Sequence, residues 1–205
     1  MGKYSQSNED QVIIDYFNGK IGTFCDIGSN DGVTFSNVRR LVELGWSGVF
    51  VEPSPKAFQM LKENYEGLTA QGQKLYFYNF ALGTTNDEVE FWDSETHLNK
   101  GDHGLLSTMV EDERDRWRGQ KYNKIMVKSF RWKTFLNRLT IKTFDVVSID
   151  IEGMEVEVME QMDFRDTSLV CAEWNGNKET KEEFDRILSG FKVIYTSPEN
   201  LIYAR

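Results

Sequence analysis

The chain has 205 residues, of which 40% are hydrophobic and 28% are charged, as expected for a soluble globular domain with one core. The net charge of −9, from 33 acidic and 24 basic residues, argues against partners that need a broad basic face, such as duplex DNA. No apolar run approaches the roughly 18 residues of a membrane span, and no secretion signal is visible. Cys25 and Cys171 fall in predicted buried strands without C-x-x-C spacing. These features favour structural cysteines and a cytoplasmic location.

A polar segment at residues 5–10 precedes the first predicted helix, which has apolar residues at helical spacing from 12 to 17. Ser7 and Asp10 resemble a capping box that would begin this helix, and Gly19 would end it. At the edge of a ligand cleft, Gln6 and Asp10 would contact the ligand. Capping is the safer role for Asp10.

The first strand is predicted at residues 23–28 and runs into a turn with the sequence Gly-Ser-Asn-Asp-Gly. A strand, a glycine turn and a helix together bring backbone N–H groups close to a nucleotide-like ligand. The glycine spacing is G-x-x-x-G rather than G-x-G-x-x-G. This turn alone therefore leaves an ordinary strand-to-helix connection as an equally good interpretation.

The second apolar run, residues 48–52, ends in Glu52. An acidic side chain at the tip of the second strand can accept hydrogen bonds from both ribose hydroxyls of a nucleoside. Its distance along the chain from Gly28 is close to the gap of about 20 residues expected for this role. A solvated carboxylate at a strand end is the alternative, and the preceding turn favours the ribose role.

Strands and helices alternate along the rest of the chain. This order predicts a single domain, residues 1–205, with a doubly wound, mostly parallel sheet and an antiparallel C-terminal hairpin. A capping box of Thr180 and Glu183 would begin the last helix. Further helices are predicted at 35–44, 55–65, 132–139 and 154–162, and further strands at 75–81, 89–92, 125–130, 144–153, 168–174, 191–196 and 201–204.

A long polar stretch at about residues 93–124 interrupts this alternation and contains both histidines, His97 and His103. Loops of that length are uncommon in compact domains and are often functional. We interpret it as a substrate-side insertion or lid, partly helical around residues 110–118. An isolated loop histidine is more often inert than catalytic.

Polar residues follow several of the predicted strands. Ligands of doubly wound sheets bind at the carboxyl ends of the strands, so these residues would meet at one edge. Asn79 could hydrogen-bond to the edge of a nucleotide base there, although a role in forming a turn is nearly as good an interpretation. Asp150 and Glu152 would point the same way if the chain is still extended. The whole set is residues 26–32, Glu52, Asn79, Asp150, Glu152, Glu173 and Asn175.

A combination of short motifs resembles the FkbM-type methyltransferases. The resemblance runs from about residue 5 to residue 190 and is weakest at 93–124. It implies a class I methyltransferase fold, a Rossmann-like seven-stranded sheet whose seventh strand is antiparallel. The motifs are SQ and ED within 5–10, DIGSNDG at 26–32, FSN at 35–37, GWSG at 45–48, VEP at 51–53, ALG at 81–83, SIDIEG at 148–153 and AEWN at 172–175.

The resemblance also implies that S-adenosylmethionine is the cofactor. Asp26, Gly28 and Asn30 would line its methionine and sulfonium end, and Glu52 would hold the ribose. Asn79, with the backbone of Phe80, would border the adenine. The full set of expected cofactor contacts is Gln6, Asp26, Gly28, Ser29, Asn30, Glu52, Asn79 and Asp150.

Family members usually methylate a hydroxyl of a sugar, a glycan or a secondary metabolite. The resemblance therefore implies a small-molecule or glycan hydroxyl acceptor, and we expect no nucleic acid partner. Methyl transfer from a sulfonium is an in-line displacement, for which alignment supplies much of the catalysis. A hydroxyl must also lose its proton. The candidate bases are Asp150 and Glu152, with His103 third.

A divalent cation is a second use for the acidic residues. Asp150, Glu152, Glu173 and Asn175 offer the oxygen ligands that Mg²⁺ or Ca²⁺ prefers. The arrangement is similar to that of macrocin-type sugar O-methyltransferases, in which a cation holds the acceptor hydroxyls and would acidify them. In the alternative interpretation, Asp150 caps the following helix and Glu173 pairs with a lysine.

Two other functions remain open at this stage. A nicotinamide-dependent oxidoreductase could use a similar sheet, but the missing G-x-G-x-x-G and the terminal hairpin argue against it. A catalytically silent module could bind a nucleoside or a partner protein, and retention of all the motifs argues against that. The oligomeric state is also open, because Trp92, Trp117 and Trp132 could mark an interface or fill the core.

Overall fold

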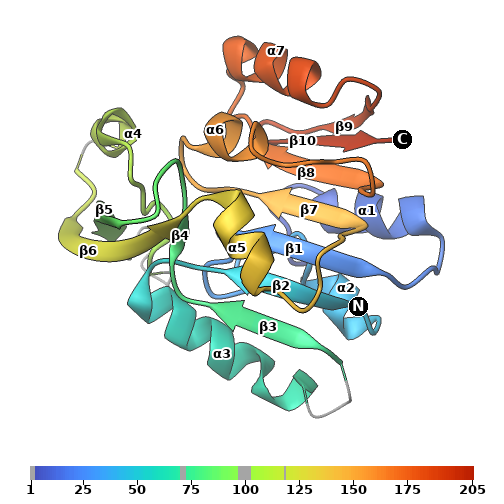
Figure 1. The fold of residues 1–205 in the computed structure, drawn as a ribbon, viewed down its shortest axis with the longest axis horizontal. Helices are drawn as coiled ribbons and strands as arrows, with labels where there is room; N and C mark the ends of the chain where they lie inside the picture. Colours follow the sequence, from blue (N-terminus) through green and yellow to red (C-terminus); the bar gives the residue numbers. More distant parts are fainter. Residues whose placement is uncertain (1–2, 70–72, 97–102, 118) are drawn as a thin grey trace.

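The computed structural model describes residues 3–69, 73–96, 103–117 and 119–205, and contains a large and a small sheet with helices packed around them (Figure 1). The large sheet has seven strands in the order β3-β2-β1-β7-β8-β10-β9. Its strands are β1 Thr23–Ile27, β2 Ser47–Val51, β3 Leu75–Tyr78, β7 Val146–Ile149, β8 Leu169–Glu173, β9 Lys192–Thr196 and β10 Asn200–Ala204.

Neighbouring strands of the large sheet are parallel except where β10 pairs with β8 and β9, to both of which it is antiparallel. This confirms the doubly wound sheet with an antiparallel C-terminal hairpin. From β1 the chain first extends the sheet through β2 and β3, and later returns to add β7 on the other side of β1. Such a reversal of strand order opens a crevice at the carboxyl ends of the two central strands, β1 and β7.

Helices cover both faces of the large sheet because its strand residues are apolar on both sides. One face buries Phe24 and Phe50 against α1, α2 and α3, and the other buries Cys25 and Val147 against α5, α6 and α7. The two cysteines are free and buried, as predicted. The helices are α1 Glu9–Phe17, α2 Arg39–Glu43, α3 Pro55–Thr69, α4 Glu111–Arg116, α5 Trp132–Arg138, α6 Glu155–Met159 and α7 Lys178–Ile187.

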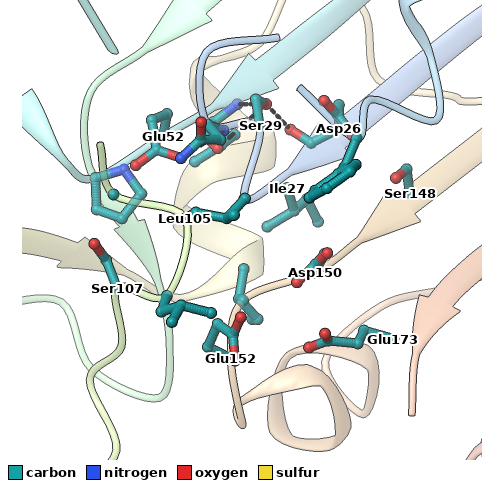
Figure 2. A pocket seen from close by; sticks show the side chains of 18 of the residues that line it. Asp26, Ile27, Ser29, Glu52, Leu105, Ser107, Ser148, Asp150, Glu152 and Glu173 are labelled. Carbon is teal, nitrogen blue, oxygen red and sulfur yellow. Dashed lines mark hydrogen bonds between the residues drawn. The ribbon is translucent and has the colours of Figure 1, made fainter. Parts of the chain in front are cut away.

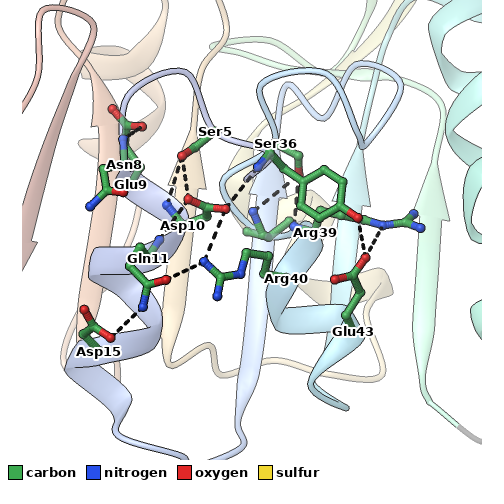
Figure 3. A network of polar contacts seen from close by, with 12 residues as sticks. Ser5, Asn8, Glu9, Asp10, Gln11, Asp15, Ser36, Arg39, Arg40 and Glu43 are labelled. Atoms are coloured by element: carbon green, nitrogen blue, oxygen red, sulfur yellow. Dashed lines mark hydrogen bonds and ion pairs between the residues drawn. The ribbon is translucent and has the colours of Figure 1, made fainter. Parts of the chain in front are cut away.

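The N-terminal segment is held by Asp10, which does not form the predicted capping box with Ser7. Asp10 accepts hydrogen bonds from the backbone N–H of Tyr4 (3.1 Å) and the hydroxyl of Ser5 (2.7 Å) (Figure 3). Its carboxylate also pairs with Arg40 of α2 at 3.8 Å. This buried carboxylate ties the segment to α1 and α2. Helix α1 ends at Phe17, and the next residue, Asn18, takes the left-handed conformation just before Gly19, the predicted stop.

Two helices begin at different residues from those predicted. Helix α2 begins only at Arg39, because Phe35 has a φ of 58°, which is outside the helical range. The Ser36 hydroxyl then accepts hydrogen bonds from the backbone N–H groups of Val38 and Arg39. Helix α7 begins at Lys178, because the side chain of Asn177 accepts from the backbone N–H groups of residues 179 and 180. The predicted capping box of Thr180 and Glu183 is therefore wrong.

The small sheet contains β4 Ala81–Leu82, β5 Glu88–Ser94 and β6 Tyr122–Phe130, in the order β4-β6-β5. The predicted strand at 75–81 is split, because the chain leaves β3 after Tyr78 and joins β6 through β4. Between β5 and β6, the chain returns to β5 through two backbone hydrogen bonds between Trp92 and Thr108. His97 lies outside the described residues. No helix in the described part of the chain is long and apolar enough to cross a membrane.

Candidate active site

A cavity of about 500 Å³ opens at the carboxyl edge of the large sheet (Figure 2). This volume lies within the range of small-molecule sites. Residues from β1, β2, β7 and β8 reach it, together with the N-terminal segment and the insertion. Most of the predicted site residues line it: Gln6, Asp26, Gly28, Ser29, Asn30, Glu52, Asp150, Glu152, Glu173 and Asn175.

The glycine turn after β1 lies directly against the end of β7. Gly28 has a φ of +81°, and a Cβ at this position would lie 1.6 Å from the carbonyl oxygen of Asp150, so only glycine fits. The backbone N–H groups of Gly28 and Ser29 both donate to the carbonyl of Val51. Both N–H groups are therefore engaged in hydrogen bonds with the end of β2.

Glu52, at the tip of β2, holds the turn in place from inside the cavity. Its two carboxylate oxygens accept hydrogen bonds from the backbone N–H groups of Asn30 (2.8 Å) and Ser54 (2.7 Å). Burial raises the pKa of Glu52 to about 8, although these two donors oppose the effect. A carboxylate has about four acceptor positions. Two of them therefore remain for donors from a ligand, such as ribose hydroxyls.

Asp26 lies at the crevice between β1 and β7, next to Ser148, which is its direct partner in the strand register. The Asp26 side chain is buried and lines the cavity. Burial raises its pKa to about 7, while the hydroxyls of Ser148 and Ser29 lower it and the charge of Asp150 raises it. Asp26 and Glu52 thus place two separate acidic groups on the sheet side of the cavity (Figure 2).

Three carboxylates form a cluster on the other side of the cavity. Asp150, Glu152 and Glu173 each offer an oxygen, and these three oxygens lie within 4.8 Å of one another. Burial raises the pKa of Asp150 to about 6. Burial and then the charge of Asp150 raise the pKa of Glu152 and of Glu173 well above their usual value. The cluster can accept a proton or offer hard oxygen ligands to a cation.

The two structural roles considered for these carboxylates are not what the structure shows. Helix α6 has no side-chain cap. The turn before it is closed by Glu155, which accepts from the backbone N–H groups of Ile151 (2.8 Å) and Gly153 (3.1 Å). Within the described ranges, Glu173 has no ion pair with a lysine. Neither of these two roles therefore accounts for Asp150 or Glu173.

Glu152 has a strained backbone with a φ of 53°. For a residue with a Cβ, this left-handed conformation costs of order 1–2 kcal/mol. The carbonyl of Glu152 accepts a hydrogen bond from the hydroxyl of Thr108 at 2.7 Å. The insertion is thereby joined to the acidic cluster, and strain of this kind often accompanies a functional position.

Two predicted residues do not line the cavity. His103 has its Nε2 atom 2.5 Å from the Nζ atom of Lys56, and its carbonyl accepts from the side chain of Asn30 at 3.0 Å. The amide of Asn79 donates to the carbonyls of Glu52 (2.8 Å) and Pro53 (3.1 Å). The structure thus places both beside the cavity wall, behind the residues that face the cavity.

Other residues of the cavity were not singled out from the sequence. Asn37 and Ser36 belong to the FSN motif at 35–37, which was a usable signal. The insertion contributes residues 104–107, Arg116 and Trp117 to the cavity. Its sequence has no pattern that would have indicated this. A second cavity of about 300 Å³ shares Arg116, Glu173 and Asn175 with the first.

A family model described as "Methyltransferase FkbM domain" matches residues 26–193. The chain belongs to this family. The match begins at Asp26, near the end of β1, and includes all of the residues that line the cavity except Gln6, Pro198 and Glu199. A comparison with curated protein sequences finds no match to this chain.

Solved structures of methyltransferases share the fold of this FkbM domain at low sequence identity. A methyltransferase FkbM from Methylobacillus flagellatus KT superposes with a TM-score of 0.56 at 9% identity, covering 89% of this chain and 43% of that one. A putative RNA methyltransferase from Pyrococcus horikoshii gives 0.53 at 12%, covering 97% and 82%. The magnesium protoporphyrin IX methyltransferase from Synechocystis PCC 6803, solved with bound SAM, gives 0.50 at 13%, covering 98% and 79%.

The family and the fold make this chain a methyltransferase domain, for which S-adenosylmethionine is the expected cofactor. This argues against the nicotinamide-dependent oxidoreductase considered from the sequence. The likeness to the RNA enzyme shows the fold alone. The acceptor must therefore be argued from the chemistry of the cavity.

Proposed function

We propose that this FkbM domain transfers a methyl group from S-adenosylmethionine to a hydroxyl of a sugar, a glycan or a secondary metabolite. The observation that carries the proposal is that Glu52 and the cluster of Asp150, Glu152 and Glu173 line one cavity. A nucleoside held at Glu52 would direct its reactive end across the cavity toward these carboxylates (Figure 2). A methyl donor and a base would then face the same acceptor.

Glu52 suits the ribose because its carboxylate is buried, fixed by two backbone donors and still able to accept. Asp26 and the turn of Gly28, Ser29 and Asn30 support the methionine and sulfonium end from β1. Gln6 would close this end from the N-terminal segment. The Asn79 contact with adenine stays a prediction, since its amide is engaged with the backbone at Glu52.

The acceptor hydroxyl must lose its proton as the methyl group arrives. Asp150, with a pKa near 6, is largely ionised at neutral pH and is the first candidate for the base. Burial and then the charge of Asp150 raise the pKa of Glu152 well above its usual value, and Glu152 is the other candidate for the base. His103 is a weaker candidate because its ring lies against Lys56.

A divalent cation fits the same residues. Asp150 and Glu173 bring carboxylate oxygens close together, and the Asn175 side chain lines the cavity next to them. Such hard oxygen donors are the set that Mg²⁺ prefers. When bound, the cation would acidify and orient the acceptor hydroxyl. Glu152 would then remain beside the acceptor as the proton-accepting side chain.

The electrostatics of the cavity favour an uncharged acceptor over a nucleic acid. The acidic cluster would repel a phosphate backbone. Arg116, on the cavity wall, is already paired with Glu113 at 3.1 Å. A polyol acceptor would instead donate hydroxyl hydrogen bonds to the carboxylates without this repulsion.

The test is a transfer assay with S-adenosylmethionine and a panel of sugars, with S-adenosylhomocysteine release as the signal, in Mg²⁺ or in EDTA. We expect turnover with at least one polyol and a loss of about 100-fold or more in Asp150→Asn or Glu152→Gln. Glu157→Gln, an exposed change on α6, is the matched control. Wild-type rates in both cluster variants would refute the assignment of these carboxylates. A loss of activity in EDTA would identify the cation requirement.

A further inference from the structure

Asn37 is a buried amide whose polar atoms are only half used. The side chain is 6% exposed and lines the main cavity. Its Nδ2 donates to the hydroxyl of Ser148 at 3.4 Å. Its Oδ1 has no hydrogen-bond partner among the residues that the structure describes. A buried carbonyl left unpaired costs of order 1–3 kcal/mol, so this atom is expected to meet a donor from a ligand.

In either orientation the amide keeps one polar group without a partner among the described residues. If its oxygen and nitrogen were exchanged, the oxygen would accept from Ser148 and the NH₂ group would be unpaired instead. The backbone before Asn37 is also strained where it brings this residue to the cavity. Phe35 adopts a φ of 58°, and the Ser36 hydroxyl accepts from the N–H groups of Val38 and Arg39. Together these features turn the chain into the cavity before α2 begins.

The surroundings of Asn37 select a positively charged donor. Ser148 is the direct register partner of Asp26, and alternate residues of a strand share a face, so both side chains lie on the α2 side of the sheet. Asp26 is an acceptor when ionised. An amide carbonyl next to a carboxylate is an acceptor pair for an ammonium group. Glu52 lies on the other side of the Ser29 turn (Figure 2).

We infer that Asn37 Oδ1 binds the α-ammonium group of the methionine part of the cofactor, beside Asp26, which the family resemblance already implies at this end. This inference rests on the proposed function, since it needs S-adenosylmethionine in the cavity. It assigns the two ends of the cofactor to different residues. Glu52 holds the nucleoside, and Asn37 with Asp26 holds the amino acid. Asn37 would thus distinguish the whole cofactor from a nucleoside that lacks the amino acid.

The test compares the affinity of three ligands by calorimetry: S-adenosylhomocysteine, its decarboxylated analogue, which keeps the amine, and 5′-methylthioadenosine, which lacks the amino acid. Asn37→Leu should weaken binding of both amine-bearing ligands by roughly ten- to a hundredfold, because a hydrogen bond to a charged group is lost. Its affinity for 5′-methylthioadenosine should equal that of wild type. Glu52→Gln should weaken all three.

Asn64→Leu is the matched control, because the Asn64 amide supports the same turn by donating to the Asp31 carbonyl, at 2.9 Å, from outside the cavity. It should leave the ratio of the three affinities unchanged. Equal losses for all three ligands in Asn37→Leu would overturn the inference, as would wild-type affinity for the decarboxylated analogue. Failure of the wild-type protein to bind any of the three would instead refute the proposed function, and the inference with it.

Discussion

At the scale of single residues, we expect Glu52 to couple cofactor binding to proton release. Its pKa is about 8 in the free protein because it is buried. Two ribose hydroxyls would donate to the charged form and lower this pKa. Binding of S-adenosylhomocysteine at pH 7.5 should therefore release protons, measured by calorimetry in buffers of different ionisation enthalpy. Glu52→Gln should bind more weakly and release fewer protons. Equal release from both proteins would show that Glu52 is not the ribose ligand.

The strained Glu152 should carry function at a cost in stability. Glu152→Gly removes both the unfavourable φ of 53° and a buried carboxylate repelled by Asp150. We expect this variant to lose transfer activity and to gain about 1 kcal/mol of stability at pH 7.5, after the entropic cost of glycine. For a chain of this size that gain corresponds to a rise in Tm of roughly 2–4 °C. A lower Tm with retained activity would contradict this role.

At the scale of elements, the contact between the β1 turn and the end of β7 depends on Gly28. In Gly28→Ala the new Cβ would collide with the backbone of Asp150, so the turn or the end of β7 must move. We expect a loss of at least about 3 kcal/mol in the free energy of unfolding, measured by urea titration. Gly67→Ala in α3, where a Cβ meets nothing within 4 Å, should gain about 0.5–1 kcal/mol. Similar effects of both changes would refute this packing.

The elements show which features local patterns can predict. The strands before Gly28 and Glu52 were predictable because continuous apolar runs signal strands buried on both faces. The starts of α2 and α7 were not, because they depend on where a single side chain, Ser36 or Asn177, accepts backbone hydrogen bonds. The splitting of the 75–81 strand depends on the pairing of β4 with β6. That contact is distant in sequence and leaves no local pattern.

The candidate site was predictable to the extent that strand order decides it. Glu52 and Asp150 follow buried strands and Glu173 ends one, and parallel strands bring their carboxyl ends to one edge. Asn37 was missed because its place in the cavity depends on a strained turn at Phe35. The part of the cavity wall formed by residues 104–107 was missed because the insertion has no periodic pattern.

At the scale of the whole molecule, the buried carboxylates should make the protein less stable as pH rises. Asp26 and Glu52 have pKa values of about 7 and 8 in the folded protein, against about 4 when unfolded. Between pH 4 and 8 the folded state therefore binds more protons, so the free energy of unfolding falls as pH rises. Urea titrations in EDTA should show a loss of several kcal/mol from pH 5 to pH 8. Stability that rises over this range would contradict burial of these groups.

The central claim is that the cavity binds S-adenosylmethionine through an acid at the tip of β2. The most direct measurement is a calorimetric titration of wild type and Glu52→Gln with S-adenosylhomocysteine, with NADH as the comparison ligand. We predict that wild type binds S-adenosylhomocysteine and not NADH, and that the variant binds it at least roughly tenfold more weakly. Binding of NADH alone, or of neither ligand, would contradict the claim.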